Sequence, residues 1–282
     1  MSKTRIENKV FDEERALYHL TDTTVEGCTF AGPRDGESAL KEARDVEVRN
    51  CAFSLRYPLW HTERFLLKGS TMDELTRAPI WYACDGVIES CGITGIKCLR
   101  ECDRITVKNS RIASPEFGWK CRDVKVENSE IESEYLFFDC RNVTVDGLKM
   151  KGKYSFQYIE NIVIRNSHLD TKDAFWHSKN VTVYDSYVKG EYLGWYSQNL
   201  TLVNCKIVGT QPLCYCKGLK LVNCTTEGCD LSFEYSDVEA EIVGHIDSVK
   251  NPRSGHIVAD SIGETVWEDS VMETSCRVTT RK

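Results

Sequence analysis

Hydrophobic and polar residues alternate in short runs that recur along the chain at a constant spacing. In the segment 122–127, Val124 and Val126 lie between polar residues, which is the period of a strand with one buried face. Every 19 residues the same two positions are again β-branched or leucine: Ile105/Val107, Val143/Val145, Ile162/Ile164, Val181/Val183, Leu200/Leu202 and Leu219/Leu221. A repeat of this length predicts a solenoid, in which each unit stacks on its neighbours.

Each of these strands is followed by a residue type that favours a sharp corner. Gly, Asn, Asp and Ser tolerate left-handed backbone angles at small cost. Here they precede a second, mostly small residue in the pairs Gly27-Cys28, Asn50-Cys51, Gly69-Ser70, Ser90-Cys91, Asn109-Ser110, Asn128-Ser129, Gly147-Leu148, Asn166-Ser167, Asp185-Ser186, Asn204-Cys205 and Asn223-Cys224. A further column of asparagines precedes the strand, and we expect their amides to hydrogen-bond along the stack. Its members are Asn142, Asn161, Asn180 and Asn199.

A short second strand at 129–131 and a third segment near 136–140 complete one repeat. Leucine-rich repeats have a similar period, but their L-x-x-L-x-L frame and helical segment are missing. The pattern therefore predicts an all-β chain, a single-stranded parallel β-helix (a solenoid) of about 11 coils of mostly 19 residues. We expect an N-terminal cap over 1–22 with an amphipathic segment at 9–20, the β-helix over 23–236, and irregular last coils with a frayed tail over 237–282. A helical turn is expected at 35–43.

Composition limits the classes of partner. The chain has 282 residues with 41% hydrophobic content, enough for a sizeable core. No stretch approaches the length of a membrane span, so we expect a cytoplasmic protein without a membrane partner, although a chain lacking its signal would look the same. The formal net charge of −7 argues against a nucleic-acid partner and fits an acidic polysaccharide poorly.

Nine of the 14 cysteines fall in two columns, where they exchange with serine or isoleucine. This pattern is typical of small buried residues that fill the core. A stack spreads thiols along a line, whereas a metal ion needs ligands that converge on a point. We therefore expect neither a metal site nor a cofactor, although stacked thiols lie close enough to oxidise.

The third segment carries the candidate chemistry. Its outward column includes Tyr82, Glu101, Lys120, Asp139, Tyr158, His177, Tyr196 and Tyr215. Five of the six tryptophans occupy the column just before it, and alternation predicts that they point inward unless a bulge exposes them. These are Trp60, Trp81, Trp119, Trp176 and Trp195. Asp170, Lys172 and Asp173 form a separate charged corner.

Two interpretations of this outward column remain open. In one it is a solvated face, on which Glu101, Lys120 and Asp139 neutralise one another and His177 stacks between Tyr158 and Tyr196. In the other it is a sugar-binding groove with catalytic carboxylates, His177 and Lys120, and with substrate-binding tyrosines at positions 82, 158, 196 and 215. Glu101 and Asp139 are expected about 9.6 Å apart, near the upper limit for an inverting glycosidase pair. Lys120 between them opposes this role, because it would keep both carboxylates ionised.

The coil pattern resembles the right-handed parallel β-helix superfamily, which includes pectate lyases and polygalacturonases. Segments 56–61 (RYPLWH), 172–177 (KDAFWH), 190–196 (GEYLGWY) and 209–215 (GTQPLCY) resemble a bacterial β-helix family catalogued only as a domain of unknown function. The superfamily implies a lyase or hydrolase acting on an oligosaccharide. The polygalacturonase motifs Asn-x-Asp, Asp-Asp, Gly-His-Gly and Arg-x-Lys are absent, and so is the acidic calcium cluster of pectate lyases. The alternatives are a non-catalytic scaffold that binds a glycan or protein, and self-association through the aromatic face.

Overall fold

The computed structural model describes residues 4–32 and 36–281. Every regular element in these residues is a strand, and they form a parallel β-solenoid of about 14 turns of about 19 residues, rather than about 11. The predicted fold class is confirmed. The described part of the chain contains no helix suited to crossing a membrane. Two compact units, Met1–Thr144 and Val145–Lys282, are described separately.

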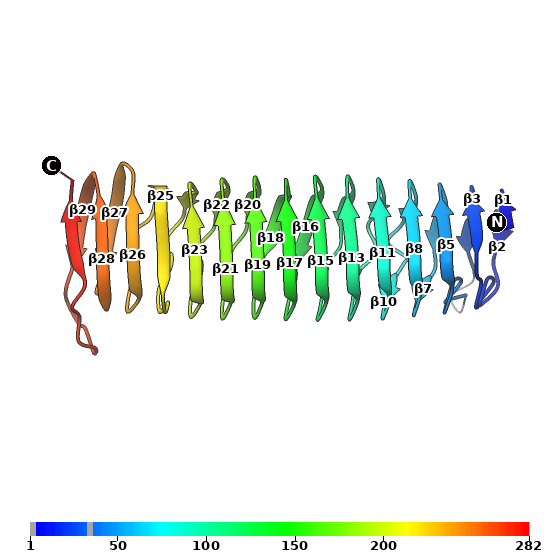
Figure 1. The fold of residues 1–282 in the computed structure, drawn as a ribbon, viewed down its shortest axis with the longest axis horizontal. Helices are drawn as coiled ribbons and strands as arrows, with labels where there is room; N and C mark the ends of the chain where they lie inside the picture. Colours follow the sequence, from blue (N-terminus) through cyan, green and yellow to red (C-terminus); the bar gives the residue numbers. More distant parts are fainter. Residues whose placement is uncertain (1–3, 33–35, 282) are drawn as a thin grey trace. The chain divides into compact units, whose positions relative to one another are not determined.

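The first face of unit 1 is a parallel sheet whose strands run side by side in the same direction (Figure 1). In the pair β13–β15, Ile105 lies opposite Val124 and Val107 opposite Val126, and all four side chains are buried. The alternation seen in the sequence thus becomes the inner wall of the coil. The strands are β1 (Thr4–Glu7), β3 (Thr23–Glu26), β5 (Arg44–Arg49), β8 (Glu63–Lys68), β11 (Cys84–Glu89), β13 (Asp103–Lys108) and β15 (Arg122–Glu127), with β17 (Arg141–Asp146) at its limit.

Shorter strands form the second face of unit 1, and two more strands lie on its third face. On the second face these are β2 (Val10–Phe11), β4 (Thr29–Ala31), β6 (Ala52–Ser54), β9 (Thr71–Met72), β12 (Gly92–Ile93), β14 (Arg111–Ala113) and β16 (Glu130–Glu134). On the third face β7 (Leu59–Trp60) pairs with β10 (Ile80–Trp81). The third face is otherwise built from turns.

Unit 2 repeats this arrangement. Its first face contains β19 (Glu160–Arg165), β21 (Lys179–Tyr184), β23 (Gln198–Val203), β25 (Leu219–Glu227), β26 (Asp237–Ile242), β28 (Ser254–Ala259) and β30 (Arg277–Thr280). Its second face contains β18 (Lys149–Lys153), β20 (His168–Asp170), β22 (Tyr187–Lys189) and β24 (Lys206–Val208), and β27 (His245–Lys250) pairs with β29 (Ser261–Val266). The long strand β25 pairs with both β23 and β24, so it continues across the corner between the faces.

The predicted asparagine ladder is present. Asn180 donates its side-chain N–H to the amide oxygen of Asn161 at 3.1 Å, and Asn199 donates to Asn180 at 3.0 Å. All three residues have left-handed backbone angles, with φ between 54° and 60°. The side chains therefore satisfy one another where the backbone turns.

The third segment is not the extended strand that the sequence suggested. Left-handed residues alternate along it, as in Glu116, Gly118 and Lys120, with φ of 59°, 75° and 53°. Such backbone angles cost conformational energy for residues other than glycine, and hydrogen bonds between coils offset this cost. Lys120 N–H, for example, donates to the carbonyl of Phe138 at 2.9 Å. Because each coil closes through this tight turn, its last residue lies at the surface.

The ends are more regular than the sequence indicated. The segment expected as an amphipathic cap contributes β2, and β1 and β2 pair in parallel with β3 and β4, so the coils begin before residue 23. Residues 36–43 are a third-face turn rather than a helical turn, since Ser38 N–H donates to the carbonyl of Arg56 at 2.9 Å; residues 33–35 lie outside the described part. Beyond residue 236, β26, β28 and β30 still pair in parallel, but their partners lie 17 and 21 residues apart instead of 19, and residues 267–276 contain no strand.

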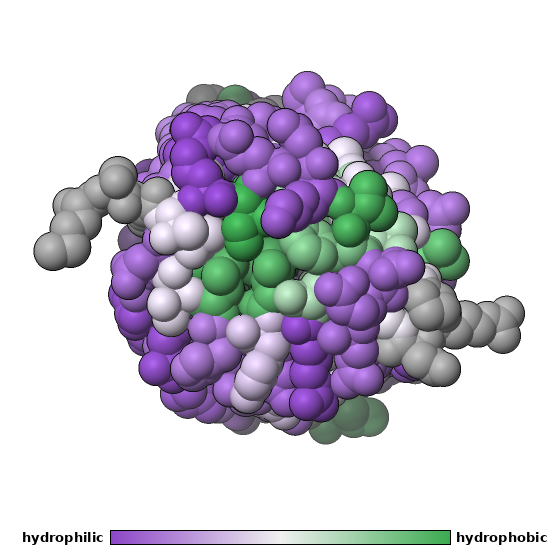
Figure 2. Space-filling view, turned by 90° about the vertical axis from the view of Figure 1, so that its right-hand side faces the viewer, coloured by the Kyte–Doolittle hydropathy of each residue, from purple (hydrophilic) through white to green (hydrophobic). Residues whose placement is uncertain are grey.

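The first coil closes one end of unit 1 incompletely. Apolar side chains gather there inside a hydrophilic rim (Figure 2). Ile6 and Phe11 are half-buried, whereas Val25 and Phe30, which lie opposite them in the next coil, are fully buried. The core of unit 1 therefore reaches the surface at this end.

The cysteines fill the core as predicted. All 14 are free thiols, and each is buried except Cys84, which is half-buried. Cys51 donates its thiol to the carbonyl of Arg49 at 3.2 Å, and burial raises the pKa of Cys51 to about 11. Such thiols act as small apolar residues with a weak donor.

Candidate binding surface on the third face

The corner row is the set of residues at the last left-handed corner of each third-face turn. Its φ values lie between 48° and 60°, which turns the side chains toward solvent. The eight residues singled out in the sequence all belong to it, and each is exposed except Tyr215, which is half-buried. Unit 1 contributes Tyr82, Glu101, Lys120 and Asp139, and unit 2 contributes Tyr158, His177, Tyr196 and Tyr215.

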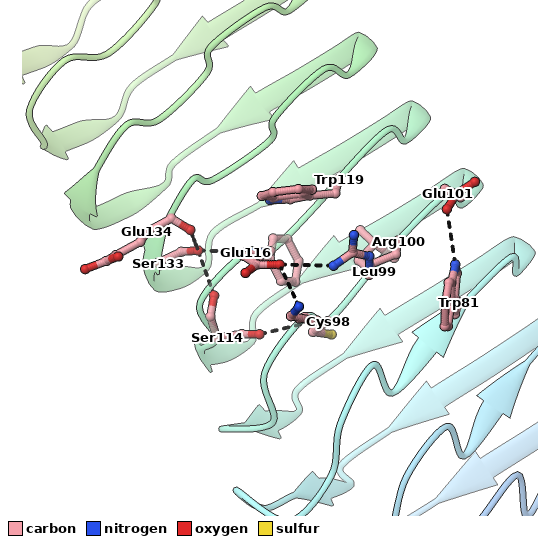
Figure 3. A network of polar contacts seen from close by, with 12 residues as sticks. Trp81, Cys98, Leu99, Arg100, Glu101, Ser114, Glu116, Trp119, Ser133 and Glu134 are labelled. Atoms are coloured by element: carbon pink, nitrogen blue, oxygen red, sulfur yellow. Dashed lines mark hydrogen bonds and ion pairs between the residues drawn. The ribbon is translucent and has the colours of Figure 1, made fainter.

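The charged part of the corner row does not form the predicted chain of ion pairs. Among the described residues, no salt bridge joins Glu101, Lys120 and Asp139 to one another. Glu101 instead accepts a hydrogen bond from Nε1 of Trp81 at 3.4 Å, which Figure 3 shows. The structure therefore does not show the ion pairs of the solvated-face interpretation.

Arg100 replaces a tryptophan in the column beside the corner row. Its guanidinium lies 4.9 Å from the ring centroid of Trp119 and donates to Glu116 at 3.0 Å (Figure 3). Lys97 approaches the same carboxylate at 3.5 Å. Both cations share one carboxylate, and together with the ring of Trp119 they connect neighbouring turns.

Tyr82 belongs to a small aromatic group in unit 1. Its ring is 40% exposed and stacks on His61 at 5.0 Å and on Trp81 at 5.2 Å. His61 therefore covers part of the ring that was expected to hold a sugar. The exposed part includes the ring edge.

The corner row of unit 2 forms a continuous aromatic ladder, defined as Tyr158, His177, Tyr196 and Tyr215. Successive ring centroids lie 5.0, 5.0 and 4.9 Å apart, with interplanar angles of 11°, 8° and 12°. Tyr158 and Tyr196 are 50% and 43% exposed. Because each inner ring is stacked on both sides, His177 and Tyr196 have no open face for a sugar ring. Their edges, which carry the polar atoms, remain available.

The ladder ends at a carboxylate. Tyr215 donates its hydroxyl to Glu234 at 3.3 Å, and Lys250 pairs with Glu234 at 2.9 Å. Burial and then the charge of Glu234 raise the pKa of Tyr215 to about 12. One extra residue in the following coil places Tyr235 in the corner row, 5.9 Å from Tyr215, so Glu234 lies just before the corner.

The tryptophans of the column beside the corner row are half-buried. The sequence had suggested that they point inward unless a bulge exposes them, and the structure lies between these two arrangements. Trp176 and Trp195 stack at 5.5 Å with an interplanar angle of 3°. Their Nε1 groups donate to the backbone carbonyls of Tyr192 and Gln211 at 2.7 and 2.8 Å. These indoles therefore connect consecutive coils and support the ladder from beneath.

Asp173 is an acidic residue that the sequence marked only as part of a charged corner. Its side chain is buried, and burial raises its pKa, with the charge of Glu191 adding to the effect and Lys172 opposing it. Gln157 donates to its backbone carbonyl at 2.8 Å. Hydrophobic patterning offers no signal for this burial, because it results from the tight third-face turn. In the described residues, no group of three or more His, Cys, Asp or Glu side chains converges on a metal position.

The family described as "Protein of unknown function (DUF3737)" matches residues 4–279. The chain belongs to this family. Its match covers both units and all of the corner row. No curated protein matches the chain.

Solved structures share the fold at low similarity. PfbA, a surface adhesin of Streptococcus pneumoniae, is 8% identical over 100% of this chain and 86% of its own, with a TM-score of 0.39. The catalytic domain of a GH87 alpha-1,3-glucanase in complex with nigerose is 10% identical, and the match covers 99% of this chain but only 63% of that domain, with a TM-score of 0.30. The A-module of the mannuronan C-5 epimerase AlgE4 of Azotobacter vinelandii is 9% identical over 99% of this chain and 88% of its own, with a TM-score of 0.28. Likeness at this level concerns the fold alone.

Proposed function

We propose that this protein is a non-catalytic scaffold that binds an extended neutral polysaccharide along the aromatic ladder of unit 2. The observation that carries the proposal is the constant ring spacing of 5.0, 5.0 and 4.9 Å along Tyr158, His177, Tyr196 and Tyr215. A row of evenly spaced polar edges favours a ligand with its own linear repeat. An extended polysaccharide has such a repeat, whereas the surface of a globular protein rarely does.

The chemistry of the ladder suits hydroxyl groups. The phenol groups of Tyr158 and Tyr196 both donate and accept hydrogen bonds, and the ring nitrogens of His177 do so between them. Since stacking on neighbouring coils fixes the rings, binding orders few side chains and loses little conformational entropy. The net charge of −7 favours a neutral over an acidic chain.

A catalytic role has weaker support. Efficient general acids and bases have pKa values near the working pH, which burial and neighbouring groups provide. Glu101, Lys120 and Asp139 are exposed on unit 1, and no ion pair joins them in the described chain. His177 is stacked between two tyrosines, which holds its ring in place as a binding group.

The experiment is a binding screen on immobilised neutral glycans, followed by affinity measurement on any hit. Tyr196→Ser removes the phenol group of Tyr196 and the stacking of its ring on His177 and Tyr215. We expect this variant to bind at least tenfold more weakly than the wild type. Tyr187→Ser is the matched control, because Tyr187 stacks on His168 at 4.4 Å on the second face of the same unit. We expect this control to bind like the wild type.

Assays for reducing ends and unsaturated products accompany the screen. Product release that disappears in Glu101→Gln, Asp139→Asn or His177→Gln would replace the binding proposal with the enzyme hypothesis. Equal affinity of the wild type and Tyr196→Ser would remove the ladder from the binding surface. A wild-type protein that holds no neutral glycan contradicts the proposal.

A further inference from the structure

The exposed N-terminal end of unit 1 is a second surface, independent of the ladder. Within the described residues, β1 and β2 pair only with β3 and β4, so their outer edges leave backbone N–H and C=O groups unpaired. Edges of this kind are templates for pairing with another chain.

Apolar side chains lie inside these two edges. Ile6, Phe11 and Leu17 are half-buried, and Figure 2 shows this apolar area within its hydrophilic rim. In the next coil the corresponding side chains are fully buried. One more layer of chain would therefore remove this apolar surface from water.

The charges on β1 indicate what that layer is. Arg5 and Glu7 are exposed on the strand, and Ile6 lies between them on the inner side. Arg5 pairs with Glu7 of its own strand at 2.7 Å, and it also reaches Glu26 of the next coil at 2.6 Å. The second contact shows that its side chain can bridge one layer to a carboxylate two positions along. A two-fold axis through Ile6 would place Arg5 opposite Glu7 of a second copy, twice, with the two Ile6 side chains facing each other inside.

We propose that this end is an isologous interface, at which β1 pairs antiparallel with β1 of a second copy. The self-complementary order Arg5-Ile6-Glu7 favours an identical partner over an unrelated one. A two-fold contact also covers the exposed edge of both copies, so the assembly stops at a dimer. Head-to-tail stacking would instead leave one end open for further growth.

The test is sedimentation equilibrium of the full chain over a range of concentrations. We expect the mass to approach twice 32.2 kDa at high concentration and to fall to 32.2 kDa on dilution. Arg5→Glu places two acidic pairs across the axis and is expected to weaken the dimer about tenfold or more. The double variant Arg5→Glu with Glu7→Arg restores opposite charges across the axis, and its dimer is expected to recover.

Arg5→Glu also loses the contacts of Arg5 with Glu7 and Glu26 within its own copy, and the double variant restores opposite charges within the strand as well as across the axis. Glu26→Gln removes one of these contacts within the copy without changing β1, and its dimer is expected to match that of the wild type. Tyr196→Ser serves as a second control and is expected to leave the dimer intact, which separates this interface from self-association through the ladder. A wild-type protein that stays monomeric, an unchanged dimer in Arg5→Glu, or masses that grow beyond the dimer would overturn the proposal.

Discussion

Nε1 of Trp176 donates to the backbone carbonyl of Tyr192, 16 residues later in the sequence, at 2.7 Å. The bond joins one coil to the next directly beneath the aromatic ladder. The tryptophan column therefore has a structural role, because it joins consecutive coils.

Replacing Trp176 with Phe should therefore destabilise the protein. The change removes the donor and leaves the carbonyl of Tyr192 without this partner. Trp119→Phe is the matched control, because Nε1 of Trp119 is buried without a partner in the described structure. Both changes remove similar ring area, so we expect the free energy of unfolding to fall by about 1 kcal/mol more for Trp176→Phe. Denaturant unfolding measures the difference, and equal losses would show that the bond contributes nothing.

Asp173→Asn should stabilise the protein at neutral pH. Burial raises the pKa of Asp173 in the folded state, so its ionised form costs stability once the pH rises through that pKa. Below the ordinary aspartate pKa both variants are neutral at this position, and the gain should disappear near pH 3. Thermal unfolding at pH 3 and pH 7 compares them.

Asp237→Asn should have the opposite effect. Hydrogen bonds from Arg253 hold the pKa of Asp237 below its ordinary value, so its contribution to stability is present at neutral pH and is lost as the solution becomes acidic through the folded-state pKa. A melting temperature that moves in the same direction for both variants at pH 7 would contradict these assignments of the two carboxyl groups.

Thiol labelling of the native protein should begin at Cys84. It is half-buried while the other thiols are buried, although burial and the neighbouring Asp85 raise its pKa and slow its reaction. Cys84→Ser should remove the fastest phase of labelling with a disulfide reagent, whereas Cys51→Ser should leave it unchanged. Persistence of the fast phase in Cys84→Ser would mean that another thiol is accessible.

Asn180→Ala should weaken unit 2 by about 1–2 kcal/mol, because it loses two side-chain hydrogen bonds and places a Cβ-bearing residue without a compensating amide at φ 54°. Asn180→Gly keeps the left-handed angle at small cost and should lose less. Gly218, with φ 66°, already occupies the equivalent corner. Chemical denaturation ranks the variants, and equal losses would assign the whole effect to the hydrogen bonds.

The first face could be predicted in detail from the sequence, because the alternation of Val124 and Val126 with polar residues indicates which side of the strand is buried. The corner residues were equally informative, since Asn180 and Gly218 signal a left-handed angle by residue type alone. The third face was less predictable. Glu116 and Lys120 adopt left-handed angles although their residue types give no such signal, so an extended segment was expected where the chain turns.

The composition of the site could be predicted but its geometry could not. The column containing Tyr158, His177 and Tyr196 follows from the repeat, and its exposure follows from its polarity. Ring stacking depends on side-chain rotation, which the repeat does not encode, so the sequence left open whether these rings stack on one another or offer open faces to a sugar. Likewise, the partner of Glu101 was expected to be Lys120, whereas the structure shows Trp81.

The single extra residue that places Tyr235 rather than Glu234 at the corner shows that repeat length determines which side chain occupies that corner. The preceding coils of the ladder all have the same length, so duplicating one whole coil would lengthen the row by one ring and leave every other ring in place. The span of this surface can thus change in steps during evolution, independently of the sequence of the core. Inserting a single residue would instead place a different side chain at the corner of that coil and of every later coil in the row.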